Sequence, residues 1–186
     1  MNKLIIWVLA ALIALAVFSG VGMYNSLVAA NENIDGKWSQ VENNLQRRAD
    51  LIPNLVETTR AFAAQEKEIF TNIAEARAKL AGANSVAETA QADSELSQAL
   101  SRLLVVVENY PQLKSDANFR QLADELAGTE NRLATARKDY NDAVQAYNTR
   151  IKRFPTNIVA GMGGFGPREY FSAQPGAQNV PQVKFD

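Results

Sequence analysis

The chain begins with an apolar run long enough to cross a membrane. From Leu4 to Tyr24 it carries no charged side chain, and about 20 residues at 1.5 Å each span the roughly 30 Å hydrocarbon layer of a bilayer. Trp7 and Tyr24 lie near its two ends, where aromatic rings prefer the headgroup level. We predict a transmembrane anchor over residues 1–25. A cleaved signal peptide is the alternative, although the apolar run continues past the Ala14-Leu15-Ala16 triplet that would suit cleavage.

The charges around the span predict an orientation. Lys3 precedes the apolar run, and Lys37 is the first cation after it. Because basic residues are retained on the cytoplasmic side, this bias favours a cytoplasmic N-terminus and a domain on the opposite side of the membrane.

The composition excludes several classes of function. The formal charge is −1, from 19 basic and 20 acidic residues, so the basic footprint of a nucleic-acid-binding protein is missing. The sequence contains neither Cys nor His, which excludes thiolate nucleophiles, Ser-His pairs, zinc-thiolate sites and the Glu-x-x-His motif of di-iron bundles. Any catalysis would therefore have to rest on carboxylates, Lys, Tyr or Ser. We expect no cofactor, no metal and no nucleic-acid partner.

Two interleaved heptad series follow the anchor and predict a helix that extends to Leu80. A chain reversal at Pro53 would have no reason to preserve the seven-residue phase, so we predict one helix kinked there, about 85 Å long at 1.5 Å per residue. The first series is Tyr24, Asn31, Trp38, Leu45, Ile52, Thr59, Glu66, Ile73 and Leu80; the second is Leu27, Ile34, Val41, Arg48, Leu55, Phe62, Ile69 and Ala76.

The rest of the chain predicts an all-α, up-and-down bundle of three to four helices over residues 26–155. Gly82 marks a helix end and Ser85 a new start, although the polar stretch 88–94 suggests that the second helix begins late. That helix ends at Pro111, and a third runs from about Asp116 to Phe154. If the chain does not reverse at Pro111, the last two helices form one return arm of a two-helix hairpin. Glycines and prolines predict an irregular tail over 156–186.

The predicted helix lengths do not match, which suggests self-association. The first helix exceeds the other two, so part of its apolar seam lacks a partner in the same chain. The exposed residues would be Trp38, Val41 and Leu45, and an apolar stripe of this kind usually marks an association site. We predict that these residues form a homo-oligomer interface.

Four charged residues occupy positions in otherwise apolar seams. Arg48 and Glu66 belong to the two series above, and Glu130 and Arg137 belong to a further series in the last helix, Ala123, Glu130, Arg137, Val144 and Ile151. Buried charges have to be paired, and polar seam residues often fix helix register and oligomer state. We interpret the four as a structural ion-pair network. The alternative is a ligand pocket or proton relay, in which Glu130 or Glu66 would carry catalysis.

Several long motifs, in order along most of the chain, resemble the bacterial LemA family. They are Tyr24-Asn25-x-Leu27-Val28, Trp38-x-x-Val41, the run LQRRADLIPNLV from Leu45 to Val56, Glu108-x-Tyr110-Pro111-x-Leu113-Lys114, the Thr129-Glu130 and Ala136-Arg137 pairs, the Tyr140-Asn141 and Tyr147-Asn148 pairs, and Phe154-Pro155-x-Asn157.

This resemblance implies a single-pass protein of the bacterial inner membrane with a helical domain and no established enzymatic activity. Some relatives are associated with magnetosome membrane formation, which points to membrane organisation. With the orientation predicted above, the domain would be periplasmic or extracytoplasmic. The leading hypothesis is a non-enzymatic scaffold that self-assembles through its helical stalk and organises or shapes the lipid bilayer. The alternative is an adaptor or accessory subunit that binds another membrane protein of the envelope.

Overall fold

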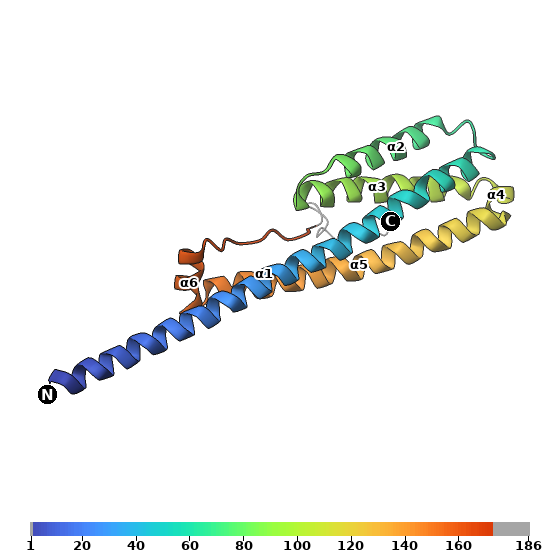
Figure 1. Cartoon of the computed structure of the whole chain (residues 1–186). Coiled ribbons are helices and arrows are strands. Elements are labelled where there is room, and N and C mark those ends of the chain that lie inside the picture. Colours follow the sequence, from blue (N-terminus) through green and yellow to red (C-terminus); the bar gives the residue numbers. More distant parts are fainter. Residues whose placement is uncertain (1, 173–186) are drawn as a thin grey trace, which may run out of the picture. The chain divides into compact units, whose positions relative to one another are not determined.

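The computed structural model describes residues 2–172, and the regular secondary structure in this range consists of helices (Figure 1). The predicted all-α class is confirmed. The helices are α1 (Asn2–Arg60), α2 (Lys67–Gly82), α3 (Val86–Val107), α4 (Pro111–Ser115), α5 (Ala117–Lys152) and α6 (Thr156–Gly163).

These residues form two compact units. The anchor unit consists of residues 2–39 and 138–169, and the bundle unit consists of residues 40–137 and 170–172. Helices α1 and α5 each contribute one part to each unit. Residues 173–186 of the predicted tail lie outside the described residues.

Helix α1 passes through Gly36 and Pro53 and ends at Arg60. The prediction of one helix continuing to Leu80 is wrong, because residues 61–66 lie between α1 and α2 and the chain reverses there. The guanidinium of Arg60 lies 5.1 Å from the ring centre of Phe70 in the returning helix. The heptad phase survives the turn because both helices face the same core. A period of seven reports which residues are buried and does not report whether the chain reverses.

Pro53 has a structural role in the α1–α2 hairpin. A prolyl nitrogen carries no hydrogen, so the carbonyl four residues earlier, that of Ala49, loses its helical donor. Arg77 of α2 supplies a replacement, since its Nε donates to the Ala49 oxygen at 3.1 Å. The proline therefore leaves the Ala49 carbonyl of α1 without a donor in its own helix, and a side chain of α2 donates to it instead.

Helix α3 begins where the sequence predicts a start, and earlier than its apolar residues suggest. The Oγ of Ser85 caps it by accepting from the backbone N–H of Glu88 at 3.1 Å. The Glu88 carboxylate accepts in turn from the Asn84 N–H at 2.8 Å. These bonds satisfy backbone donors at the helix start. The polar stretch 88–94 is helical, and it contains the buried residues Thr89 and Asp93.

The chain reverses again between α3 and α5 through the short helix α4. Pro111 is the first residue of α4, where its missing N–H is harmless. Helix α5 then runs back along α3, and its Arg137 pairs with Asp93 near the start of α3. The alternative of one long return arm is therefore wrong, and the bundle unit is an up-down-up-down four-helix bundle (Figure 1).

The core of the bundle unit is shared by α1 to α5. Burying one large apolar side chain stabilises a fold by about 1.5–3 kcal/mol relative to leaving it in water, so this cluster holds the hairpins together. Its large members are Ile52 and Leu55 from α1, Phe70 and Ile73 from α2, Leu96, Leu100, Leu103 and Val107 from α3, Leu113 from α4, and Phe119 and Leu126 from α5.

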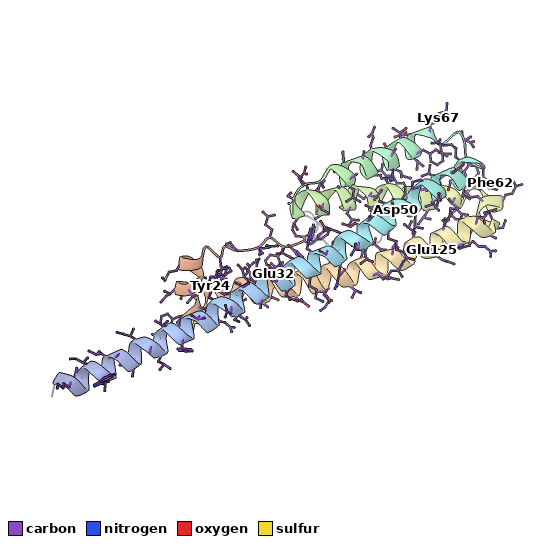
Figure 2. The ribbon with its side chains drawn as sticks, viewed as in Figure 1. Tyr24, Glu32, Asp50, Phe62, Lys67 and Glu125 are labelled. Atoms are coloured by element: carbon purple, nitrogen blue, oxygen red, sulfur yellow. The ribbon has the colours of Figure 1, made fainter. Side chains whose placement is uncertain are left out.

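The anchor unit contains an antiparallel pair of helical segments. The Nζ of Lys37 on α1 lies 3.0 Å from the Asp139 carboxylate on α5, and Arg150 donates to the Ser26 hydroxyl at 2.7 Å. Towards its N-terminus, α1 is long and apolar enough to cross a membrane, and the side chains of this apolar window are not buried in the protein (Figure 2).

The prediction of irregular structure from residue 156 is wrong for the first eight residues, which form α6. Pro155 immediately precedes the helix, where a proline is tolerated. Gly164 ends it with a φ of 74°, a left-handed conformation that glycine adopts without steric cost. The following residues, 165–172, contain no regular secondary structure.

Candidate functional site

Four charged side chains from three helices meet inside the bundle unit. Nη1 of Arg48 (α1) lies 2.8 Å from Oδ1 of Asp93 (α3) and 2.7 Å from Oε2 of Glu130 (α5). Arg137 (α5) pairs with the other Asp93 oxygen, and its Nη1 lies 3.6 Å from Oε1 of Glu130. We call these four residues the charge cluster. It contains two cations and two anions, so its charges balance.

Burial is uneven across the charge cluster. Arg48 and Asp93 are 4% and 2% exposed, whereas the side chains of Arg137 and Glu130 are 23% and 41% exposed. Charges taken out of water have to be compensated by partners, because their hydration is lost. Arg48 and Asp93 therefore depend most on the cluster, while Glu130 retains contact with solvent.

The hydrogen bonding of the charge cluster is incomplete within residues 2–172. The Nε atoms of Arg48 and Arg137 have no hydrogen-bond partner there. Oε2 of Glu130 is close to Arg48, but their contact is an ion pair without hydrogen-bond geometry. Arg137 has a further contact, since its guanidinium carbon lies 5.1 Å from the ring centre of Phe171. That distance is typical of a cation–π interaction.

Two opposing effects act on the pKa of Asp93. Burial raises the pKa of its carboxyl above the ordinary value by disfavouring the charged form, and this is the larger effect. The neighbouring Arg137 and Arg48 lower the pKa by favouring the anion, but they do not fully offset the burial. The arginines are therefore what make an ionised Asp93 tolerable at this depth.

Sequence reasoning identified three members of the charge cluster and missed Asp93. Glu66 was grouped with them, but it lies apart, in the turn before α2, and accepts from the Tyr110 hydroxyl at 3.1 Å. Asp93 had a usable signal: 93, 96, 100, 103 and 107 follow one another at helical spacings of three and four, and all five residues are buried. Extending the helical spacing of the apolar residues Leu96, Leu100, Leu103 and Val107 backwards by three positions would have reached Asp93.

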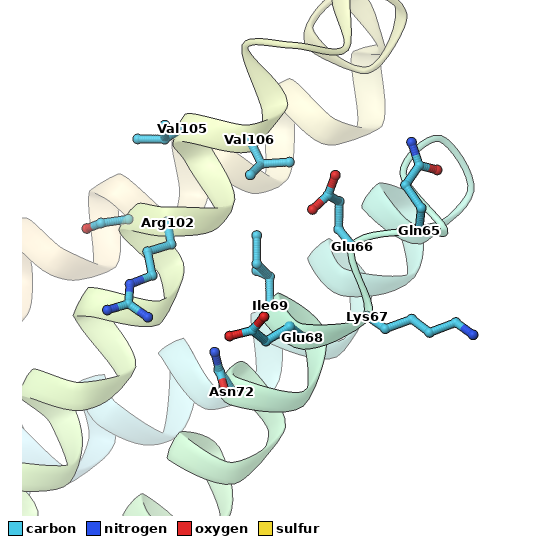
Figure 3. A pocket seen from close by; sticks show the side chains of 10 residues that line it. Gln65, Glu66, Lys67, Glu68, Ile69, Asn72, Arg102, Val105 and Val106 are labelled. Carbon is cyan, nitrogen blue, oxygen red and sulfur yellow. The ribbon is translucent and has the colours of Figure 1, made fainter.

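An open hollow of about 600 Å³ lies at the other end of the bundle unit, between the start of α2 and the end of α3. Figure 3 shows the Glu66 and Glu68 carboxylates on its α2 side and Val105 and Val106 on its α3 side. Val105 is 66% exposed, and the adjacent Leu104 is 43% exposed. A polar rim beside exposed apolar side chains is typical of a surface that contacts another protein.

The structure places the predicted oligomer interface inside the chain. Val41 and Leu45 are 0% and 5% exposed, and the Trp38 ring lies 5.2 Å from the Tyr140 ring. Trp38, Val41 and Leu45 therefore do not form the expected unpartnered stripe. Val41 and Leu45 are not available for a contact with a second copy of the chain.

The described residues do not place three His, Cys, Asp or Glu side chains where they would hold a metal ion. The charge cluster is also occupied by its own counter-charges. The ion pairs of the cluster fix α1, α3 and α5 in one register, since each charge is paired with a charge on another helix.

Comparison with known proteins identifies relatives along most of the chain. The model of the LemA family matches residues 37–185. Magnetosome protein MamQ 2 of Paramagnetospirillum magneticum is 32% identical over 178 residues, covering 82% of this chain and 65% of its own length. Magnetosome protein MamQ of Magnetospirillum gryphiswaldense is 29% identical over 189 residues, 86% of this chain and 70% of its own length.

Protein LemA of Metamycoplasma hominis is 25% identical over 145 residues, covering 77% of this chain and 66% of its own. The chain thus spans about two thirds of the length of the relatives that it matches. The residues matched by the family model include the segments that carry Arg48, Glu130 and Arg137. The chain belongs to the LemA family.

Proposed function

We propose that this protein is a non-catalytic, single-pass membrane scaffold that holds a four-helix bundle near the bilayer and organises the membrane through self-association. One observation carries the proposal: α1 contains both the apolar run and the bundle residues Ile52 and Leu55. The same helix therefore contains both the membrane-spanning segment and part of the bundle core, and no linker separates these two segments. Relatives named for the magnetosome support an organising role.

The charge cluster supports the non-catalytic part of the proposal. A catalytic acid or base needs access to a substrate. Asp93 is instead enclosed by two arginines and 2% exposed. A chain without His and Cys also lacks the commonest general bases and nucleophiles. These features favour a structural role for the cluster.

We expect self-association to use the exposed end of α3. Since the chain has no cysteine, Val105→Cys introduces a single reactive thiol there. In native membranes, a bifunctional maleimide should convert the full-length Val105→Cys protein to a dimer. Asp50→Cys, a solvent-exposed position of the same unit, serves as the matched control and should remain monomeric.

Two outcomes would contradict the scaffold. If neither variant forms dimers and the detergent-extracted full-length protein sediments as a monomer at micromolar concentration, self-association fails. If Val105→Cys is instead cross-linked to a different membrane protein, the adaptor reading replaces the scaffold. The exposed pair Leu104 and Val105 is the observation that favours this second candidate.

We also propose that the N-terminus lies in the cytoplasm of a bacterial cell and that the bundle unit lies beyond its plasma membrane. Lys3 on one side of the span supports this orientation. The Val105→Cys thiol should then react with a membrane-impermeant maleimide added to spheroplasts. Labelling that appears only after the membrane is permeabilised would show the opposite orientation. It would not contradict the membrane anchor itself.

A further inference from the structure

Helix α6 presents an apolar face to the outside of the protein. Phe154, Ile158 and Met162 are 81%, 54% and 86% exposed. Ile158 and Met162 are four residues apart on α6 and lie on the same side of the helix, and Phe154 lies in the turn just before it. Outside the apolar anchor, Phe154 and Met162 are the most exposed large apolar side chains among the described residues. Such a face usually marks a contact site.

The anchor unit places α6 next to the end of the apolar run. The ring of Phe165, just after α6, packs edge-on against Tyr24 with 5.3 Å between ring centres. A Cβ added to Gly163 would lie 3.2 Å from Tyr24 Cε2 and 2.8 Å from the Phe165 ring, so a glycine permits this close approach. Tyr24 is the last residue of the run and is labelled in Figure 2. These contacts place α6 beside the end of the apolar run, where the run would leave the bilayer.

The segment after α6 is tied to the same unit by several bonds. Asn148 on α5 makes two bonds of 2.8 Å with the Arg168 backbone, one to its carbonyl oxygen and one from its N–H. The Tyr140 hydroxyl donates to the Glu169 carbonyl at 2.8 Å. The Arg168 guanidinium pairs with Asp35 on α1. Both ends of α6 are therefore held, since the end of α5 precedes it directly.

The charge around α6 fits an anionic surface. The sequence from 143 to 168 contains no acidic residue, and it contains Arg150, Lys152, Arg153 and Arg168. Arg150 and Arg168 are engaged with α1, whereas Lys152 and Arg153 are exposed immediately before Phe154. A short apolar face flanked by basic residues is the composition of a helix that lies in a membrane interface.

We propose that α6 together with Phe154 is a second membrane contact, lying in the bilayer surface beside the transmembrane anchor. Phe154, Ile158 and Met162 enter the boundary between headgroups and acyl chains, and Lys152 and Arg153 bind anionic headgroups. The inference rests on the proposed membrane anchor. Its effect is to fix the anchor unit at two points on the lipid, where a lone span would leave the unit free to tilt.

Depth measurement in lipid tests this contact. Full-length Met162→Cys is labelled with an environment-sensitive fluorophore and reconstituted into vesicles of phosphatidylcholine and phosphatidylglycerol that contain nitroxide-labelled lipid. We expect nitroxides placed near the headgroup to quench the fluorophore at position 162. A fluorophore on Ile158→Cys should be quenched in the same way, and agreement between the two positions would show that the result is not an artefact of a single substitution. Val21→Cys reports the anchor, and Asp50→Cys reports the bundle unit and should keep its fluorescence.

The four positions separate the possible failures. If position 21 is quenched and positions 158 and 162 are not, the second contact is wrong and the anchor stands. If position 21 also keeps its fluorescence, the proposed anchor is wrong as well. Cross-linking of Met162→Cys into a dimer without quenching would assign the face to a second copy and overturn the proposal.

A charge variant tests the headgroup part of the inference. In the labelled Met162→Cys background, Lys152→Gln with Arg153→Gln should reduce the quenching in phosphatidylglycerol vesicles to the level found in pure phosphatidylcholine. Quenching at position 21 should not change. Equal quenching in both lipids before the charges are removed would contradict a role for anionic headgroups.

Discussion

Replacing Arg48 with methionine is expected to lower the free energy of unfolding by about 3 kcal/mol, the cost of removing one partner from a buried ion pair. Methionine keeps most of the apolar stem, so the loss reports mainly the missing charge. The remaining cluster would carry two carboxylates and one guanidinium, with Asp93 only 2% exposed. Chemical denaturation of the full-length protein in detergent, followed by circular dichroism, measures the change.

A double-mutant cycle distinguishes charge balance from simple loss of contacts. Asp93→Asn alone leaves two cations facing one anion and should also destabilise the protein. The double variant leaves Arg137 with Glu130, 3.6 Å apart, and restores neutrality. Its destabilisation should therefore be smaller than the sum of the single effects by at least about 1 kcal/mol.

The exposed pair Lys138 and Asp142 provides the matched control for the cycle. Its ions are 2.6 Å apart, but the side chains are 74% and 59% exposed. Exposed pairs of this kind are worth little, so Lys138→Met with Asp142→Asn should show no measurable coupling. Additive effects at Arg48 and Asp93 would refute the interpretation of the cluster as a balanced network.

Replacing Asn148 with alanine is expected to speed tryptic cleavage after Arg168 by roughly ten- to a hundred-fold. The variant loses both side-chain bonds to the Arg168 backbone. Each net hydrogen bond contributes about 1 kcal/mol, and about 1.4 kcal/mol shifts a local opening equilibrium tenfold. When opening is fast relative to cleavage, proteolysis follows that equilibrium. Timed digestion of the full-length protein with mass spectrometry gives the rate.

Two variants on α5 calibrate this result. Asn148→Asp keeps an acceptor for the Arg168 N–H and loses the donor to its carbonyl, so its rate should lie between wild type and alanine. Asn131→Ala removes an exposed asparagine of the same helix and should leave the rate unchanged. If Asn148→Ala is cleaved no faster than Asn131→Ala, the bonds of Asn148 do not hold this segment.

Periodicity was sufficient to predict that the chain is helical and to find many of its buried residues, although the seam residues Tyr24 and Phe62 are exposed. Ile52, Leu55 and Ile73 belong to the predicted seams and are buried in the bundle core. Periodicity was not sufficient to locate the turn after Arg60, because residues on both sides of it keep the same phase. Glu66 was misplaced for that reason: it occupies a heptad position by count, but it lies in a turn.

Other features depend on contacts between distant residues, which a local pattern does not encode. Asn148 binds the backbone of Arg168, twenty positions further along the chain, and Arg168 reaches Asp35 on the first helix. The glycines and prolines after residue 154 suggest a loop when counted as breakers. Their effect depends on position, since Pro155 precedes α6 and Gly164 ends it.

The bond from Arg77 to the Ala49 carbonyl has a consequence for the order of folding. During synthesis α1 emerges first, and at Pro53 it cannot complete its own hydrogen bonding. Water has to occupy the Ala49 carbonyl until α2 is made and docks. The proline thus replaces a bond to the next turn of α1 with one that depends on a later segment. We expect the middle of α1 to gain full protection from solvent only when the hairpin closes.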